Sequence, residues 1–420
     1  MTGLYEILAY TLGYIGLFAA SFYMINLLSF YKNKKEPEEN TNYKVSIIIP
    51  AFNEEESIAK TIKSALSLDY PQKNYEIIVI DDGSADKTYS LAKKFESNSF
   101  PKVRVFTKKN GGKGTALNLG LKKVSGELIF TMDADTFVSS DALRKMTKLF
   151  SNKYTMAVTP AMGVFKPKTI WQRVQHIEYY MGVFLRKSFA TMNAIHITPG
   201  AFSGYRKSFF DKHGGFDENN ITEDLEVALR IQSYDYIIEN APGAAIYTLG
   251  PANLKDLTAQ RRRWYTGLIT NLWTYRKKLF GPKKGAMGVV VLPVAISTVV
   301  LAVALTITVL IKTLNNIKKE IISLYSVNFQ FEDIIEFNKI VIETFFIRAF
   351  SHKIFLMSLL FLCLLWFYLS FSRREVGFKE SLRLNFILFI VLYSFFFAFW
   401  WIMSTFYVLF GKKVVWRYKK

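Results

Sequence analysis

The chain has 420 residues, of which 50% are hydrophobic and 16% aromatic, and its 54 Lys and Arg outnumber its 34 Asp and Glu to give a net charge of +20. This composition excludes a disordered tail, which would contain few apolar residues, and a disulfide scaffold, because the chain has 1 cysteine. Charged and apolar residues also occupy different stretches of the chain, which excludes an ordinary soluble domain.

Four long stretches contain no Asp, Glu, Lys or Arg, namely residues 7–31, 285–311, 354–372 and 384–411. At a rise of about 1.5 Å per residue, each helix would cross a hydrocarbon core of about 30 Å. The first stretch has no basic n-region and is too long for a cleaved signal peptide, so we predict an anchor. We therefore expect an N-terminal transmembrane helix over residues 1–31, a domain with interfacial helices over residues 32–284 and a C-terminal transmembrane region over residues 285–420.

The basic residues that flank these stretches predict the orientation of the chain. Three lysines lie between positions 32 and 35, whereas Glu6 is the charged residue before the first stretch, so residues 32–284 are expected in the cytoplasm. This segment holds 39 Lys and Arg against 26 Asp and Glu. Four crossings would place the C-terminal tail outside, yet its five basic residues after position 411 favour the inside. Either one apolar segment is interfacial or the number of crossings is not four.

Between the first two membrane stretches, strand and helix patterns alternate. We predict strands at 45–49, 76–80, 103–106 and 127–132, with helices at 55–68, about 86–95 and from residue 113. Pro50 is expected to end the first strand. The alternation predicts an α/β domain with a mainly parallel sheet covered by helices on both faces, and ligands at the carboxyl ends of its strands.

Acidic residues follow two of these strands. Asp81-Asp82-Gly83-Ser84 comes after the second strand, and Asp133-Ala134-Asp135 follows the strand at 127–132. Neighbouring carboxylates are costly unless a cation joins them, and a hard divalent ion is the usual solution. In an extended segment Asp133 and Asp135 would point to the same side. Each motif alone also fits a turn whose side chains cap a helix.

A glycine-rich segment lies between these two motifs, at residues 110–118. Its glycines would let the backbone approach a ligand, and Lys113 at a helix start would meet a diphosphate. The spacing is not that of a Walker loop. The alternative is a glycine loop that only caps a helix.

Thr222-Glu223-Asp224 precedes a helical run. An N-cap threonine and acids in the first turn are favourable for structure alone. The functional interpretation makes Asp224 a general base that takes the proton of an acceptor hydroxyl.

Gln260-Arg261-Arg262-Arg263-Trp264 lies about twenty residues before the second membrane stretch. The arginines could face anionic headgroups and the Trp could belong to an interfacial belt. Alternatively, an arginine neutralises a departing diphosphate while the indole stacks on a sugar.

In this order, these motifs resemble the signature of processive family-2 glycosyltransferases, which include cellulose, chitin, hyaluronan and poly-N-acetylglucosamine synthases. The resemblance covers residues 44–275, and the poly-N-acetylglucosamine synthases share the Thr-Glu-Asp and Gln-Arg-x-Arg-Trp forms. It implies a GT-A fold, which is Rossmann-like, and it implies Mg²⁺ or Mn²⁺ as the cofactor.

The resemblance also implies roles for individual residues. The residues that would hold the uridine are Pro50, Ala51, Asn53, Glu54 and Asp82. Lys113 and Asp133 would lie beside the nucleotide sugar, and Asp135 would bind the metal. Asp224 would be the base, and the residues that would hold the diphosphate and the end of the growing chain are Gln260, Arg263 and Trp264.

Together these expectations describe an inverting, processive enzyme of the cell membrane, with several transmembrane passes, that uses a UDP-sugar, UDP-N-acetylglucosamine in particular, to extend an exported polysaccharide. The alternatives are a non-processive transferase with a polyprenyl-phosphate or other glycolipid acceptor, and a catalytically dead membrane scaffold. Beyond the donor, the acceptor and membrane lipids, a second copy of the chain or a small accessory membrane subunit is an open alternative. No nucleic-acid partner is expected, since the acids at the strand ends are unlike a basic recognition helix.

Overall fold

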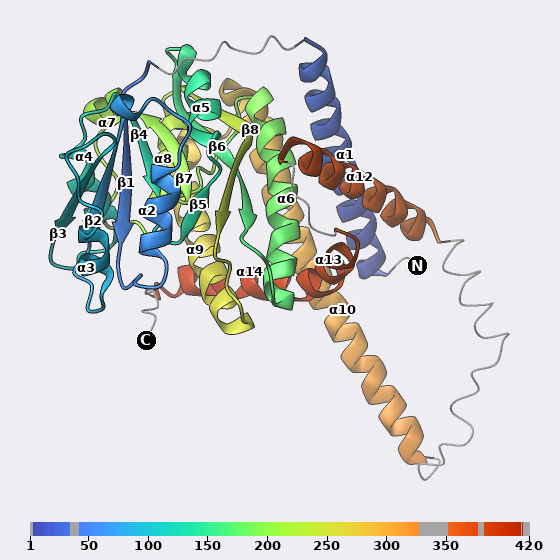
Figure 1. Cartoon of the computed structure of the whole chain (residues 1–420). Coiled ribbons are helices and arrows are strands. Elements are labelled where there is room, and N and C mark those ends of the chain that lie inside the picture. The colour runs from blue at the N-terminus through green and yellow to red at the C-terminus, as the bar shows by residue number, and fades with distance from the viewer. Residues whose placement is uncertain (1–2, 34–41, 327–351, 377–381, 413, 415–420) are drawn as a thin grey trace. The chain divides into compact units, whose positions relative to one another are not determined.

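The structure is a computed structural model that describes residues 3–33, 42–326, 352–376, 382–412 and 414 (Figure 1). The chain divides into two compact units. The first comprises Met1–Ile25 and Leu292–Phe367, and the second comprises Asn26–Val291 and Tyr368–Lys420.

The second unit contains an eight-stranded sheet with the order β3-β2-β1-β4-β7-β6-β8-β5. Its strands are β1 (Val45–Ala51), β2 (Tyr75–Asp81), β3 (Lys102–Thr107), β4 (Leu128–Met132), β5 (Thr136–Val138), β6 (Thr155–Val164), β7 (Phe202–Arg206) and β8 (Ile237–Thr248). Strands β3, β2, β1 and β4 are parallel, as are β6 and β8, whereas β7 and β5 are antiparallel to their neighbours. The predicted α/β class with a mainly parallel sheet is confirmed.

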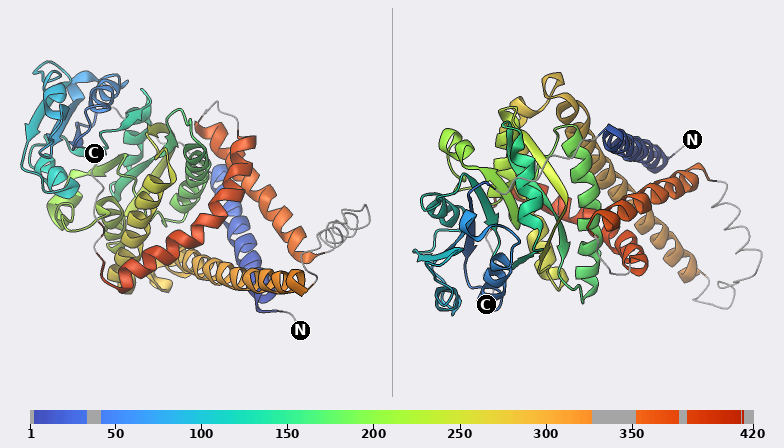
Figure 2. Two further views of the ribbon diagram at one scale, coloured as in Figure 1. Left: turned by 90° about the horizontal axis from the view of Figure 1, so that it is seen from below. Right: turned by 45° about the horizontal axis from the view of Figure 1, so that its top comes forward.

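Helices pack on both faces of this sheet (Figures 1 and 2). They are α2 (Ile58–Leu66), α3 (Thr88–Lys93), α4 (Lys113–Leu121), α5 (Ala142–Thr147), α6 (Ile170–Thr191), α7 (Lys207–His213), α8 (Glu223–Ser233) and α9 (Leu254–Leu279). Short 3-10 helices η1 (Gln72–Asn74), η2 (Lys148–Ser151) and η3 (Pro282–Lys284) and a π-helical turn, η4 (Met287–Val291), complete the segment up to residue 291.

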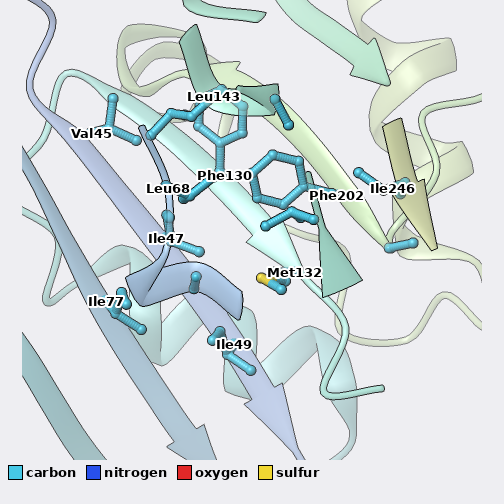
Figure 3. Close-up of a cluster of buried hydrophobic side chains, with 14 of the residues drawn as sticks. Val45, Ile47, Ile49, Leu68, Ile77, Phe130, Met132, Leu143, Phe202 and Ile246 are labelled. Atoms are coloured by element: carbon cyan, nitrogen blue, oxygen red, sulfur yellow. The ribbon is translucent and has the colours of Figure 1, made fainter. Parts of the chain in front are cut away.

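The sequence of β1 explains why both faces are covered. Ile47 and Ile49 lie in one core, together with Phe130 and Phe202 (Figure 3), whereas Ile48 lies in the core on the opposite face. In a strand that is buried on both faces, polar and apolar residues do not alternate. Its sequence is therefore a continuous apolar run.

The predicted strands and helices are confirmed, but the prediction that Pro50 ends the first strand is wrong. Strand β1 continues to Ala51, and Pro50 pairs in register with Ile80 of β2. The pairing of β1 with β4 on its other side already stops at Ile48. Beyond that point a missing N–H costs no ladder hydrogen bond on the β4 side, so proline is tolerated there.

The C-terminal segment belongs to the second unit and packs on α9 and α6. It consists of α13 (Arg383–Leu388), the π-helical turn η5 (Phe389–Tyr393) and α14 (Ser394–Leu409). Trp400 of α14 is 1% exposed and donates its indole N–H to Oγ1 of Thr258 over 3.1 Å, while Trp401 stacks on Tyr265 with 4.4 Å between ring centroids. Helix α14 therefore packs beside α9 (Figure 1).

The long apolar helices are α1 (Leu4–Asn33), α10 (Leu292–Ser326) and α12 (Lys353–Val376). Within the described residues, three helices are long and apolar enough to cross a membrane, at Leu4–Phe30, Met287–Ser323 and Lys353–Val376. The fourth expected stretch is a pair of helices, Arg383–Tyr393 and Phe395–Leu409, bent by 45°. The described part of the chain thus holds three candidate spans, or four if the bent pair is counted as one.

Candidate functional site

The Asp133-Ala134-Asp135 motif forms a turn at the carboxyl end of β4. The backbone N–H of Thr136 donates to the carbonyl of Asp133 over 3.0 Å, which closes the turn. The expectation that the motif is extended is therefore wrong, because the chain must reverse direction here to enter β5. Oδ1 of Asp133 lies 2.6 Å from Nζ of Lys113, and Oδ1 of Asp135 accepts from the hydroxyl of Thr248 over 3.4 Å.

Lys113 is the first residue of α4 and joins two of the predicted motifs. The preceding Gly112 has a φ of +92°, which a residue with a side chain rarely adopts. Nζ of Lys113 lies 2.6 Å from Asp133 and 3.0 Å from Glu223. Burial alone lowers the pKa of this ammonium, but the surrounding carboxylates outweigh burial and raise its pKa above the usual value. The amine is therefore held in its charged form.

Asp224 lies in the first turn of α8 and is held by a neighbouring loop. Its Oδ2 accepts from the backbone N–H of Gly200 over 2.9 Å, and its Oδ1 accepts from the N–H of Leu225 over 2.8 Å. The hydroxyl of Thr198 donates to the carbonyl of Asp224 over 2.6 Å. These bonds fix the direction of the carboxylate before any ligand arrives.

Thr222 and Glu223 do not act as simple helix-capping residues. Thr222 occupies the N-cap position of α8, but among the described residues its hydroxyl makes no capping bond to the helix and instead accepts from Nδ2 of Asn271 over 3.1 Å. Glu223 is buried, which raises the pKa of its carboxyl, and Lys113 opposes that rise. Thr222 therefore connects α8 to α9 instead of capping α8.

A glycine brings α9 against the start of α8. A Cβ at Gly267 would lie 2.1 Å from the hydroxyl oxygen of Thr222, so the two helices approach too closely for any side chain. This approach directs Arg263 toward the acidic residues. Burial lowers the pKa of its guanidinium, and four carboxylates oppose this, from the two aspartates of the β4 turn and from Glu223 and Asp224.

The three consecutive arginines of α9 have different partners. Arg261 pairs with Glu178 of α6, and Arg262 donates to the hydroxyl of Tyr407 in α14 over 3.0 Å. Arg263 interacts with the acidic residues of the site. The alternative in which all three face lipid headgroups is therefore wrong for Arg261, which is 1% exposed.

Two other residues of the same motif lie close to Arg263. Oε1 of Gln260 is shielded from solvent and has no hydrogen-bond partner in the part of the chain that the structure describes. Trp264 packs against the hydrophobic core, with the guanidinium of Arg261 4.5 Å from its ring centroid. A sugar could therefore stack only on the part of the indole that these contacts leave open.

The predicted uridine-binding residues shape two adjoining loops. Pro50 and Ala51 end β1, and Asn53 has a φ of +53°. The N–H of Asn53 donates to the hydroxyl of Ser84 over 3.0 Å, and its side-chain oxygen accepts from the N–H of Ala85 over 2.9 Å. Glu54 accepts from the hydroxyl of Ser57 over 2.7 Å.

Asp82 holds the glycine-rich loop. Its carboxylate accepts from the N–H of Gly112 over 2.7 Å and that of Gly111 over 3.1 Å, and it pairs with Nζ of Lys108 at 2.5 Å. Beside it, Oδ1 of Asp81 is buried without a hydrogen-bond partner among the described residues. Asp82 thus positions the loop that leads into Lys113.

The structure brings Lys113, Asp133, Asp135, Asp224 and Arg263 into one electrostatic cluster. Asn53, Glu54 and Asp82 lie in the adjoining loops, at the carboxyl ends of β1 and β2.

The sequence does not predict the contacts by which several residues hold this site together, namely Lys108, Glu178, Gly200 and Glu223. A basic residue directly after β3, next to a strand that ends in two aspartates, is a signal that could have identified Lys108. The others depend on contacts between distant parts of the chain.

The acidic residues fit a metal that is bound partly by its ligand. Among the described residues, no three His, Cys, Asp or Glu side chains are grouped as a complete metal site. Mg²⁺ is usually held by one or two carboxylates together with substrate phosphates, which Asp133 and Asp135 at a strand end can provide. Lys113 and Arg263 add positive charge for the same phosphates.

Comparison with known proteins shows which proteins the chain is similar to. Residues 46–214 match the family model described as glycosyl transferase family 2. The chain is 34% identical over 236 residues to a poly-beta-1,6-N-acetyl-D-glucosamine synthase of Staphylococcus epidermidis, which covers 55% of this chain and 57% of the relative. The synthase of the same name from Staphylococcus aureus (strain COL) is 33% identical over 251 residues, covering 59% of this chain and 60% of the relative.

A solved structure supports the fold. The mannosyltransferase of Pyrobaculum calidifontis in complex with GDP-Man and Mn²⁺ matches with a TM-score of 0.62 and 17% identity, covering 98% of this chain and 100% of that one. At this identity the match establishes the fold, which is GT-A, and not the substrate. The resemblance to family-2 glycosyltransferases is confirmed, while the aligned region spans less than two thirds of the synthases it matches.

Proposed function

We propose that this chain is an inverting, processive membrane β-glycosyltransferase that transfers sugar from UDP-N-acetylglucosamine to a growing exported polysaccharide. The observation that carries the proposal is that one cation, Lys113, joins the two acidic motifs, since its Nζ lies 2.6 Å from Asp133 and 3.0 Å from Glu223. The buried guanidinium of Arg263 interacts electrostatically with acids of the same two motifs. A cation and several acids in one buried place suit a reaction in which an anionic diphosphate leaves as a hydroxyl loses its proton.

In the proposed reaction Asp224 is the general base. The acceptor hydroxyl oxygen attacks the anomeric carbon, its proton passes to Asp224, and the bond from that carbon to the UDP oxygen breaks. Arg263 and Lys113 stabilise the charge on the departing diphosphate. A Mg²⁺ or Mn²⁺ ion at Asp135, with Asp133 beside it, supplies further positive charge when it is bound. One displacement inverts the configuration, so an α-linked donor gives a β-linkage.

The donor and the acceptor would bind at opposite ends of the cluster. Pro50, Ala51, Asn53, Glu54 and Asp82 form the loops that we assign to the uridine. Gln260 and Trp264 lie on α9 with Arg263, and we assign them to the diphosphate and to the end of the growing chain. The unpartnered Oε1 of Gln260 supports this assignment, because a shielded acceptor without a partner is costly until a ligand supplies a donor.

In the membrane arrangement that fits this function, the catalytic domain lies in the cytoplasm. The lysines between positions 32 and 35 and the basic residues after position 411 lie on the same side. Three helices that cross, with α14 packed on α9, return the chain to the side of the catalytic domain. The basic C-terminal tail then lies inside, as the distribution of charge requires. The fourth apolar stretch serves in this arrangement as a helix that packs on the catalytic unit.

Two other functions are less well supported. A transferase that loads one sugar onto a lipid carrier would not need the Gln-x-x-Arg-Trp motif, which resembles that of the processive group. A dead scaffold would be expected to lose acids from the site, yet Asp82, Asp133, Asp135 and Asp224 are all present.

The proposal is tested with detergent-purified protein, Mg²⁺ or Mn²⁺ and a panel of nucleotide sugars, with UDP release and product size measured together. The expected result is UDP release with UDP-N-acetylglucosamine and a product of many sugars. UDP release with a product of one sugar on lipid would contradict processivity. Release with a different donor would contradict the assignment of the sugar.

A further inference from the structure

Arg261 lies in α9 three residues before Trp264 and forms a two-pronged ion pair with α6. Its Nη1 donates to Oε1 of Glu178 over 2.8 Å and its Nη2 donates to Oε2 over 2.6 Å. The arginine is 1% exposed. Two parallel hydrogen bonds fix the rotation of the guanidinium relative to the carboxylate, which a lysine could not do.

The same carboxylate also binds the C-terminal segment. The hydroxyl of Tyr393, in η5, donates to Oε1 of Glu178 over 3.0 Å, and it lies 3.2 Å from the hydroxyl of Tyr265 in α9. Three parts of the chain far apart in sequence, α6, α9 and η5, therefore meet at Glu178. The carboxylates of Asp133 and Asp224 have other partners, which are Nζ of Lys113 and the backbone N–H of Gly200.

The ion pair holds the indole of Trp264 in place. The guanidinium of Arg261 covers the ring at 4.5 Å from its centroid, a cation–π contact, while the ring also packs against the core cluster that includes Tyr179. Tyr179 follows Glu178 in α6 and interacts electrostatically with both Arg261 and Asp135. Tyr179 thus links the ion pair electrostatically to the acidic turn after β4.

Stability alone is a weak reason for such a pair. Removing two charges from water costs several kcal/mol for each ion. Apolar residues of similar volume in the same place often stabilise a protein at least as much as a buried ion pair does. What the pair supplies is a fixed geometry. We propose that Glu178 and Arg261 are positioning residues for the acceptor end of the site, which hold Trp264 where the end of the growing chain binds. This inference rests on the proposed function. It adds the residues that direct the transferred sugar to the growing polysaccharide.

The test is the ratio of sugar incorporated into polymer to UDP released, measured with UDP-N-acetylglucosamine for the wild type, Glu178→Gln and Arg261→Gln. We expect the ratio to fall about tenfold or more in both variants, because a displaced acceptor lets water react in its place. The KM for the donor should stay within about twofold of the wild type, because the ion pair contacts Trp264, Tyr393 and Trp400 within the described residues. Arg261→Lys keeps the positive charge but cannot make both hydrogen bonds to the carboxylate. Its ratio should therefore lie between that of the wild type and that of Arg261→Gln.

The matched control is Arg104→Gln, which breaks the pair between Arg104 of β3 and Glu76, 2.7 Å apart, in the donor half of the domain. It should lower the thermal midpoint and leave the ratio unchanged. An unchanged ratio in folded Glu178→Gln or Arg261→Lys would overturn the positioning role. Wild-type protein that releases no UDP would instead contradict the proposed function, so the two failures are distinct.

Discussion

Gly200 donates its backbone N–H to Oδ2 of Asp224 over 2.9 Å, and a Cβ at position 200 would lie 3.0 Å from that same oxygen. The same Cβ would lie 2.6 Å from Nζ of Lys113. One glycine therefore both orients the proposed base and leaves room for the cation beside it. A side chain here would displace one of two groups whose positions matter for transfer.

Gly200→Ala is expected to lower kcat by about 10- to 100-fold, because displacement of a reacting group by a fraction of an ångström has effects of this size. The thermal midpoint should change little, since the flexible end of Lys113 can move aside. The matched control is Gly243→Ala in β8, where a Cβ would meet its nearest neighbour, the Lys145 side chain, at 3.7 Å. Full kcat in Gly200→Ala would show that this position does not constrain the site.

Lys113→Gln is expected to change how stability depends on pH. Without the ammonium, the pKa of the Glu223 carboxyl rises further in the folded state, because burial raises it and Lys113 no longer opposes that rise. A raised folded-state pKa means that the folded protein binds more protons than the unfolded one between the two pKa values, so stability falls as pH rises through that window, from about 4 upward. Thermal midpoints measured across pH should therefore decline toward neutral pH in the variant relative to the wild type. Parallel profiles would contradict the pairing.

Gly267→Ala tests the close approach of α8 and α9. The added Cβ would collide with the side chain of Thr222. We therefore expect the free energy of unfolding to fall by about 1–3 kcal/mol, which is typical of overpacking, and the activity to fall as well. Thr222→Ala removes the colliding atoms and should recover part of the loss in the double variant. Denaturant unfolding measures the free energy of unfolding of the two single variants and of the double variant. Simple additivity of the two substitutions would show that the helices do not meet at these residues.

The side of the membrane that holds the C-terminal tail can be measured by thiol labelling. In a Cys363→Ala background, a cysteine replacing Val414 should react with a membrane-impermeant reagent only after the cells are permeabilised, since we place the tail in the cytoplasm. A cysteine at Lys94, in the catalytic domain, is the matched control. Labelling of position 414 in intact cells would show that the bent pair of helices crosses the membrane.

Local patterns were sufficient to predict much of the fold. The apolar run of β1, the helix that begins at Lys113 and the acids after β2 and β4 depend on nearby residues, and each lies where the sequence indicates. Pro50 was misjudged because its tolerance depends on where β4 stops pairing, which is a property of the sheet. The turn at Asp133 depends on the short strand β5, which pairs with β8 more than 100 residues later.

The candidate site was predicted less completely. Asp224 and Arg263 carry recognisable motifs, whereas the role of Glu178 depends on its meeting Arg261 83 positions away. The three arginines of α9 look alike in sequence, and their separate partners follow from the rotation of the helix by about 100° at each residue. Gly200 is a neighbour of Asp224 only after α8 has packed beside the loop before β7.

The most direct measurement of the central claim is UDP release by Asp224→Asn with UDP-N-acetylglucosamine, compared with the wild type, with donor affinity determined by calorimetry on the same samples. The amide keeps the size of the carboxylate and can still accept from Gly200, but it cannot take a proton. We predict that UDP release falls by about 10²- to 10⁴-fold, the usual contribution of a general base, while donor affinity is retained. Undiminished UDP release by the folded variant would contradict the assignment of Asp224 as the base.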